Sequence, residues 1–254
     1  DLERKIAINI NKALNKAKEL SLGGIKDVTI LIDGALSYLK SFDVDYVEIV
    51  SKEDIEFLIK KGGSTYSNKE VQEEIWKNPS IESYYLLNRW KSQGKKEFLD
   101  LGCGLGRHSI LFGKNDFNVN CFDISEEAIK RTKEWAEKEK LKFDYKIGDM
   151  LKLPYMNDKF DCIYCRNVIS HTDTEGMKQV TKELYRVMKN NSECYLTLGS
   201  KDTWGFKQED WPLIDENTRL RMEEGPEYKI PHFYVDYNLV KKLFKNFEIF
   251  NIYQ

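Results

Sequence analysis

The chain has 254 residues, of which 41% are hydrophobic and 32% are charged. These fractions exclude collagen and intrinsic disorder, and the length allows one large domain or one domain with an appendage. The formal net charge is −2, so no overall positive field attracts nucleic acid. No apolar run reaches the roughly 18 residues of a membrane span, and the N-terminus lacks the apolar region of a signal peptide. We therefore expect a cytoplasmic protein that binds neither nucleic acid nor membrane.

The five cysteines also fit a reducing compartment. Cys121, Cys162 and Cys194 fall in expected strands, where buried thiols are more common than disulfides in such a chain. Cys162 and Cys165 have CxxC spacing, but residues three apart in a strand point to opposite faces of the sheet. That geometry argues against a redox or metal pair, and we expect no metal in the protein.

The N-terminal 64 residues are expected to form a small helical and strand extension. Apolar residues spaced three and four apart predict amphipathic helices over about 1–20 and 27–40, and VDYVEIV at 44–50 predicts a strand. The Gly-Gly-Ser sequence at 62–64 resists both helix and strand, so it predicts a linker. We place the domain boundary between residues 64 and 65.

Residues 1 to 60, with a strand after two helices, resemble the C-terminal end of pantoate–beta-alanine ligases. None of that family's nucleotide-binding motifs is present in the sequence. The resemblance therefore implies no activity and assigns no functional residue, and an unrelated extension is the alternative interpretation.

From residue 65 onward, strands and helices alternate. Helices are expected at about 68–77, 80–93, 106–114, 125–140, 174–189 and 236–245. Strands are expected at 97–101, 118–122, 143–147, 160–165, 193–198 and 247–253. This alternation predicts an α/β fold with a doubly wound, mainly parallel sheet and helices on both faces. Ligands of such sheets bind at the carboxyl ends of the strands.

The strongest functional signal is a glycine-rich turn between a strand and a helix. Asp100 closes the strand, and Gly102, Gly104 and Gly106 follow at alternate positions. Glycines let a ligand approach the backbone, and the next helix offers free N–H groups. Asp123 lies 23 residues after Asp100, at the end of the next strand, where a carboxylate can accept both hydroxyl protons of a ribose. Asp123 by itself could instead cap the helix that begins near Ser125. The combination of the glycine-rich turn with Asp123 is therefore what points to adenosine.

From about residue 70 to the end, the sequence resembles the class I S-adenosylmethionine-dependent methyltransferases. The resemblance rests on LDLGCGLGR at 99–107, FDIS at 122–125, GDMLKLPY at 148–155 and DKFDCIYCRNVISH at 158–171. It implies a Rossmann-like methyltransferase fold for residues 65–254, with S-adenosyl-L-methionine as cofactor and methyl donor.

The resemblance also implies roles for single residues. Asp100 would support the methionine end of the donor, and Asp123 would hold the ribose. Asp149 would accept from the adenine amino group, with Ile124 and Met150 beside the ring. The rest of the implied donor site consists of Gly102, Cys103, Gly104, Gly106, Arg107, Cys165 and Arg166.

Two other nucleotide chemistries are disfavoured by the same motifs. Gly-x-Gly-x-Gly differs from the Gly-x-Gly-x-x-Gly of dinucleotide sites, which argues against a nicotinamide-dependent oxidoreductase. Adenine and cytosine methyltransferases carry Asn/Asp-Pro-Pro-Tyr after the fourth strand, whereas this chain has Cys-Arg-Asn-Val at 165–168. The sequence instead resembles the small methyltransferases that act on metabolites, and this finer resemblance rests on Trp76, Pro79 and Arg107. We therefore expect a small-molecule acceptor.

Methyl transfer from a sulfonium mainly requires alignment, and it needs a base only when the acceptor must lose a proton. His171 and His232 are the candidate catalytic residues, and a structural role is the alternative for His171. The insertion at 200–235, the lid segment, is rich in aromatic residues and is expected to cover the acceptor. A surface loop pinned by aromatics is the other interpretation. Expected substrate contacts are Trp76, Trp204 and Tyr234.

One expected strand has no counterpart in the sequence. The family's sheet ordinarily has a seventh, antiparallel strand between the fifth and sixth, and none follows 247–253. We expect residues 44–50 to pair there, within one chain or between two copies, the latter making a homodimer. The alternative to an enzyme is a non-catalytic S-adenosylmethionine-binding regulatory or interaction module, with residues 1–64 as its partner-binding surface.

Overall fold

The computed structural model describes residues 27–33, 36–43, 78–225 and 227–252. The chain divides into two compact units, Asp1–Ile75 and Trp76–Gln254. The helix expected at 1–20, the strand expected at 44–50 and the linker expected at 62–64 lie outside the described residues. The predicted boundary after residue 64 therefore stays a prediction.

The described part of the first unit is a β-hairpin. Strand β1 (Asp27–Asp33) pairs antiparallel with β2 (Leu36–Asp43), and Asp33 lies opposite Leu36. The helix predicted over 27–40 is therefore wrong. The segment contains the run Val-Thr-Ile-Leu-Ile at 28–32, whose β-branched side chains favour a strand over a helix.

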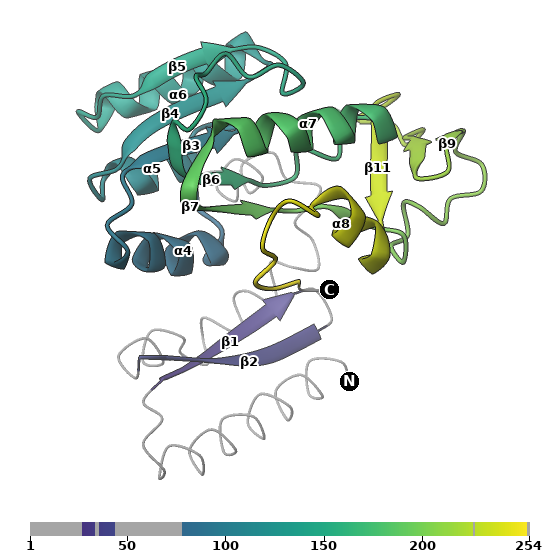
Figure 1. Ribbon diagram of the computed structural model, residues 1–254, viewed down its shortest axis with the longest axis horizontal. Helices are drawn as coiled ribbons and strands as arrows, with labels where there is room; N and C mark the ends of the chain where they lie inside the picture. Colours follow the sequence, from purple (N-terminus) through teal and green to yellow (C-terminus); the bar gives the residue numbers. More distant parts are fainter. Residues whose placement is uncertain (1–26, 34–35, 44–77, 226, 253–254) are drawn as a thin grey trace. The chain divides into compact units, whose positions relative to one another are not determined.

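The second unit contains a five-stranded sheet in the order β5-β4-β3-β6-β7 (Figure 1). Its strands are β3 (Glu97–Leu101), β4 (Asn118–Asp123), β5 (Asp144–Ile147), β6 (Phe160–Cys165) and β7 (Met188–Leu196). All neighbouring pairs are parallel. The chain runs outward from β3 through β4 to β5 and then returns to β6, so the strand order reverses beside β3. The doubly wound α/β prediction is confirmed.

Helices cover both faces of this sheet. Helices α4 (Ile81–Ser92), α5 (Arg107–Gly113) and α6 (Glu126–Lys138) lie on one face, and α7 (Thr174–Val187) and α8 (Tyr237–Leu243) lie on the other. Successive strand residues enter opposite cores: Phe98 packs with Trp90 and Phe112, and Leu99 belongs to the core of α7. Cys162 and Cys165 are likewise in different cores, as the strand geometry predicted.

Near the C-terminal side, the helix predicted at about 174–189 is confirmed but ends two residues earlier, and the strand predicted at 247–253 is wrong. Strand β7 begins at Met188, within the helix predicted over 174–189, because backbone pairing of Phe160 with Met188 ends the helix there. Residues 247–252 form no strand. The Phe247 ring packs on Tyr185 and Phe244, at centroid distances of 5.5 Å to each, so ring packing replaces strand pairing in this segment.

The lid segment folds into a small sheet of its own. Its strands are β8 (Gly199–Ser200), β9 (Leu213–Asp215), β10 (Thr218–Leu220) and β11 (Pro231–Val235), in the order β8-β11-β10-β9. Strand β8 follows β7 closely in the chain and pairs parallel with β11. In the described part of the chain, the main sheet ends at β7, and the predicted pairing of residues 44–50 remains untested.

Candidate functional site

The glycine-rich turn follows β3, where the strand order reverses. The N–H groups of Gly102 and Cys103 donate to the Phe122 carbonyl oxygen at 2.7 and 3.0 Å, which fastens the turn to β4. A Cβ atom on Gly102 would lie 2.2 Å from Val168, whereas one on Gly104 would meet no atom within 4 Å. Gly102 therefore serves close packing and Gly104 faces open space, and the contact of these glycines with a ligand remains a prediction.

Asp123 is held rigidly beside this turn. Its Oδ2 accepts from the Gly104 N–H at 2.8 Å, and its Oδ1 accepts from the Ser125 N–H at 2.9 Å. The α6 helix is capped by Ser125, whose hydroxyl accepts from the Ala128 N–H at 3.2 Å. Asp123 is therefore not the helix cap, and each carboxylate oxygen keeps lone-pair capacity for a further donor.

Asp100 is buried at the end of β3. Its Oδ2 accepts from the Ser109 hydroxyl of α5 at 2.6 Å. Burial raises the pKa of Asp100 to about 6, against the lowering effect of the Ser109 hydrogen bonds. Above that pH the site holds a buried negative charge, which a nearby cation would stabilise.

The residues expected around the adenine lie together after β4 and β5. The Gly148 N–H donates to the Asp123 carbonyl oxygen at 3.0 Å, which joins the ends of the two strands. Ile124 is 72% exposed. Asp149 is exposed and accepts from the Leu151 N–H at 2.8 Å. An exposed apolar side chain and an exposed carboxylate thus follow the two joined strand ends.

The two cysteines of the predicted donor site do not offer their side chains. Cys103 and Cys165 are buried, at 4% and 0% exposure, within the two cores. Arg107 and Arg166 are half-buried, and the charge of Arg166 adds to burial in lowering the pKa of Arg107. At this end of the site the cysteines can contribute backbone groups, and the arginines supply positive charge.

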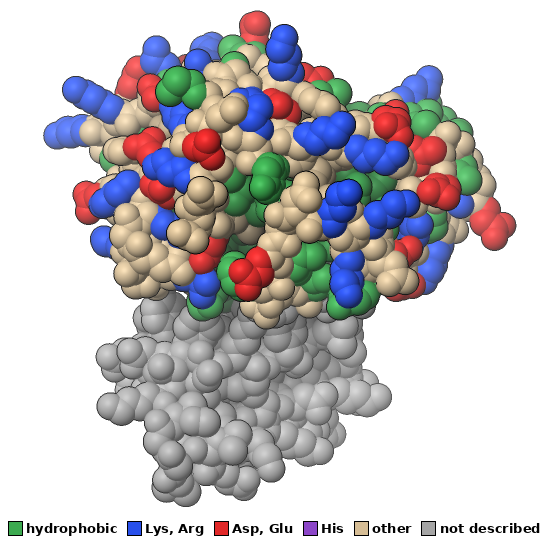
Figure 2. All heavy atoms as spheres, viewed as in Figure 1, with side chains coloured by type: hydrophobic (Ala, Val, Ile, Leu, Met, Phe, Trp, Pro, Cys, Tyr) green, Lys and Arg blue, Asp and Glu red, His purple; other side chains and the backbone are tan. Residues whose placement is uncertain are grey.

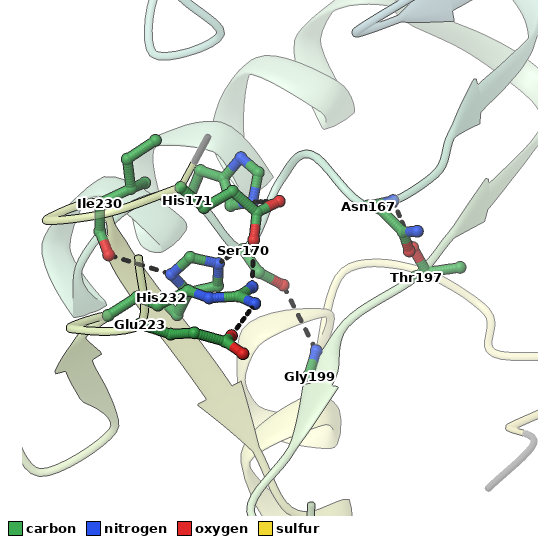
Figure 3. Close-up of polar contacts among 10 residues, drawn as sticks. Asn167, Ser170, His171, Thr197, Gly199, Glu223, Ile230 and His232 are labelled. Carbon is green, nitrogen blue, oxygen red and sulfur yellow. Dashed lines mark hydrogen bonds and ion pairs between the residues drawn. The ribbon is translucent and has the colours of Figure 1, made fainter. Parts of the chain in front are cut away.

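The structure brings the two candidate catalytic histidines together. His171 lies between β6 and α7, and His232 lies on β11, yet their ring centroids are 4.8 Å apart (Figure 3). The Phe233 N–H donates to the Ser170 carbonyl oxygen at 2.8 Å, so β11 is fastened to the loop that carries His171. Burial lowers the pKa of His171, and the neighbouring His232 lowers it further. His171 is therefore neutral near pH 7 and able to accept a proton.

Glu227 is a site residue that the sequence analysis missed. Its Oε1 lies 3.5 Å from His171 Nε2, and its Oε2 lies 3.3 Å from His232 Nε2. Arg221 pairs with Glu227 and with Glu223. Glu227 lies in the irregular segment between β10 and β11, where no periodicity marks it; the Glu-Glu-Gly-Pro-Glu cluster was the available signal.

The expected substrate residues lie in different environments. Tyr234 is 6% exposed and packs on Phe206, with ring centroids 5.3 Å apart. Trp204 is 60% exposed and contacts Trp211 edge to face. Trp76 lies outside the described residues. The structure thus places Tyr234 inside the lid segment and Trp204 on its surface, and their contact with a substrate remains a prediction.

Comparison with known proteins shows which family this part of the chain resembles. Residues 98–191 match a methyltransferase domain family. The match covers the strand before the glycine turn, the turn itself, Asp123, Asp149 and the loop of His171. It ends before the lid segment, so it covers most of the residues predicted to bind the donor and none of the lid segment.

Similar proteins agree with this class and share the fold. A ubiquinone biosynthesis O-methyltransferase of Coxiella burnetii is 34% identical over 110 residues, which cover 40% of this chain and 47% of that protein. A Pyrococcus horikoshii protein has 23% identity and a TM-score of 0.54, covering 75% of this chain and 88% of its own. A structure described as an S-adenosylmethionine-dependent methyltransferase, from Methanosarcina mazei, has 22% identity and a TM-score of 0.52, covering 60% and 78% of the two chains.

The aligned part spans less than half the length of the first curated relatives that the chain matches. Relatives are named for acceptors as different as a sterol, phosphoethanolamine and a tRNA guanine. The acceptor therefore does not follow from these similarities. The comparisons lend no support to a resemblance of residues 1 to 60 to pantoate–beta-alanine ligases.

Proposed function

We propose that the second unit transfers a methyl group from S-adenosylmethionine to a small-molecule acceptor. The observation that carries the proposal is the Asp123 carboxylate, fixed by the N–H groups of Gly104 and Ser125 at the carboxyl end of β4. It lies beside a glycine whose missing side chain leaves open space, at the reversal of the strand order. This arrangement suits an adenosine whose ribose donates two hydroxyl groups.

The other donor residues fit the charge and shape of this cofactor. The buried Asp100 carboxylate suits the cationic methionine end, because a nearby positive charge would offset its burial. Ile124 offers an exposed apolar surface to an adenine ring, and Asp149 offers a carboxylate to its amino group. When bound, the cofactor supplies a methyl group on a sulfonium, which needs no acid to leave.

The protein's contribution to the transfer is then positioning and, where the acceptor requires it, proton removal. His171 lies beyond the carboxyl end of β6, on the loop that packs against the glycine turn through Val168. A neutral imidazole there can accept the proton of an acceptor hydroxyl or ammonium group. The lid segment would exclude water above it.

A small acceptor is favoured over nucleic acid by charge. The chain carries 40 basic and 42 acidic residues. On the face shown in Figure 2, lysine and arginine side chains are interspersed with aspartate and glutamate rather than gathered into one basic surface. A phosphate backbone binds most strongly to a continuous positive surface.

The proposal is tested by measuring S-adenosylhomocysteine formation with three acceptor pools: low-molecular-weight metabolites, total RNA and total protein. We expect product only with the metabolite pool, and none with the Asp123→Ala variant. Product with RNA alone would contradict the small-molecule acceptor. Donor binding without product from any pool would favour the non-catalytic module.

A further inference from the structure

Three side chains with potential metal-ligand atoms, His171, Glu227 and His232, lie close together. One potential ligand atom from each residue lies within 4.8 Å of the other two. Each Nε2 faces the carboxylate, at 3.5 Å for His171 and 3.3 Å for His232. In a tetrahedral site with bonds of about 2.0–2.1 Å, neighbouring ligand atoms are about 3.4 Å apart. The two separations run to different oxygens of Glu227, and each is close to this ligand–ligand distance.

The contact of His232 Nδ1 with the Ile230 carbonyl oxygen indicates which ring nitrogen carries the proton. A carbonyl oxygen only accepts, so the 3.0 Å contact with the Ile230 oxygen makes Nδ1 the donor. In a neutral imidazole, Nε2 then presents a lone pair to the lone pairs of the Glu227 carboxylate. His232 Nε2 and Glu227 Oε2 lie 3.3 Å apart, so both atoms can be ligands of one cation. A carbonyl behind the imidazole is also the usual arrangement around metal-bound histidines.

The surrounding charges favour a cation over an anion. Arg221 pairs with both Glu223 and Glu227, so one positive charge meets two negative charges and the cluster carries −1 when both imidazoles are neutral. The side chains of His171, Glu227 and His232 are 28%, 36% and 12% exposed. The cluster is therefore reachable from solvent and still partly shielded from it.

We propose that His171, Glu227 and His232 bind a divalent transition-metal ion of the zinc class, with the remaining coordination positions open. Two imidazoles and one carboxylate suit late first-row divalent ions, whereas Mg²⁺ and Ca²⁺ prefer oxygen ligands. The proposal is independent of methyl transfer, because the ion needs neither donor nor acceptor to bind. Coordination to the ion would lower the pKa of an acceptor hydroxyl, which would then release its proton to solvent water in place of transferring it to His171.

The test is calorimetric titration of ZnCl₂ into the full chain. We expect one equivalent to bind, and we expect Glu227→Gln and His232→Ala to weaken binding at least tenfold, as losses around metal sites do. Glu224→Gln is the matched control, because Glu224 is an exposed carboxylate of the same segment outside the cluster. Titration with Co²⁺ should give ligand-field absorption without a thiolate charge-transfer band, which separates this site from the five cysteines.

Absent zinc binding, equal affinity in all four proteins, or a cobalt–thiolate band would overturn the proposal. His232 and Glu227 would then form an imidazolium–carboxylate pair. Glu227→Gln replaces one oxygen of a partly exposed side chain, so the fold should persist. Thermal unfolding gives a second readout, because an ion that binds the folded state raises the unfolding temperature. We expect ZnCl₂ to raise it for the wild type and for Glu224→Gln, and not for Glu227→Gln.

Discussion

At the scale of single residues, the burial of Asp100 disfavours the charged form of its carboxyl group. Its carboxyl group is 2% exposed, and burial raises its pKa to about 6. The folded state therefore holds the proton more tightly than the unfolded chain, whose aspartates titrate near 4. The stability that the protonated form contributes is complete below pH 4 and is lost as the pH rises to 6. Above pH 6 the fold retains a costly charge, which we attribute to its use in binding a cation.

Asp100→Asn should separate stability from donor binding. The pKa difference of about two units corresponds to about 3 kcal/mol. Relative to the wild type, the variant should gain up to about that much unfolding free energy between pH 4 and pH 8, while binding S-adenosylmethionine more weakly at pH 8. Urea unfolding and calorimetry measure the two quantities. A stability difference that does not change with pH would contradict this account.

Asp123 shows what sequence reasoning can and cannot decide about one residue. Its position at the end of the strand after the glycine turn predicted that it lies at the carboxyl ends of the strands. The structure places it there, as the last residue of β4. The sequence left helix capping open, because a carboxylate two residues before Ser125 could serve either purpose. The structure separates the two, since Ser125 caps α6 and Asp123 binds Gly104 instead.

At the scale of elements, the glycine turn combines two requirements that its spacing alone does not distinguish. Gly102 has φ +74° and is packed against Val168, which lies in the loop that leads to His171. Gly104 has φ +54° and faces open space. Gly102 therefore allows the turn and the loop of Val168 to pack closely, and Gly104 leaves room for a ligand.

Substitutions at these two glycines should differ in how much stability and how much donor binding they cost. Gly102→Ala should cost at least about 2 kcal/mol of stability, because its Cβ would overlap Val168 and the backbone is left-handed. Val168→Ala should restore part of that loss. Gly104→Ala should cost only the about 1 kcal/mol of the backbone strain but should weaken donor binding strongly. Urea unfolding and calorimetry test both variants, and an equal loss of stability at both positions would disagree with the packing.

The hairpin of β1 and β2 explains why an element was mispredicted. Apolar residues at helical spacing occur in 27–40, but the run Val-Thr-Ile-Leu-Ile at 28–32 is rich in β-branched residues, which favour a strand. The Asp33-Gly34 pair, a common turn signal between strands, was the overlooked feature. The strands of the lid segment were missed for another reason, because strands of two to five residues are too short to show a period.

At the scale of the whole molecule, donor and acceptor residues differ in how far the sequence could reveal them. The residues predicted to bind the donor lie at or directly after the ends of four strands, β3, β4, β5 and β6, so local motifs locate them. His171, by contrast, meets Glu227 and His232 of the lid segment where the Phe233 N–H donates to the Ser170 carbonyl oxygen. That proximity depends on β11 pairing with β8, which no local pattern encodes.

The division into two units predicts that the second one is self-sufficient. The two cores that flank β3 and β6 consist of residues after position 85, and the proposed donor residues lie between 100 and 166. A fragment of residues 76–254 should therefore unfold cooperatively and bind S-adenosylmethionine as the full chain does. Circular dichroism and calorimetry check this. An unfolded fragment, or one without donor affinity, would assign residues 1–75 a part in forming the site.

The central claim is that Asp123 holds the ribose of S-adenosylmethionine. Calorimetric titration of S-adenosylmethionine and S-adenosylhomocysteine into the wild type, Asp123→Ala and Asp144→Ala tests it most directly. Asp144 is an exposed carboxylate at the amino end of β5, opposite the site, so it is the control. Losing a charged hydrogen bond costs roughly 1.5–3 kcal/mol, so Asp123→Ala should bind at least tenfold more weakly while Asp144→Ala is unchanged. Absence of wild-type binding, or equal affinity in all three proteins, would contradict the claim.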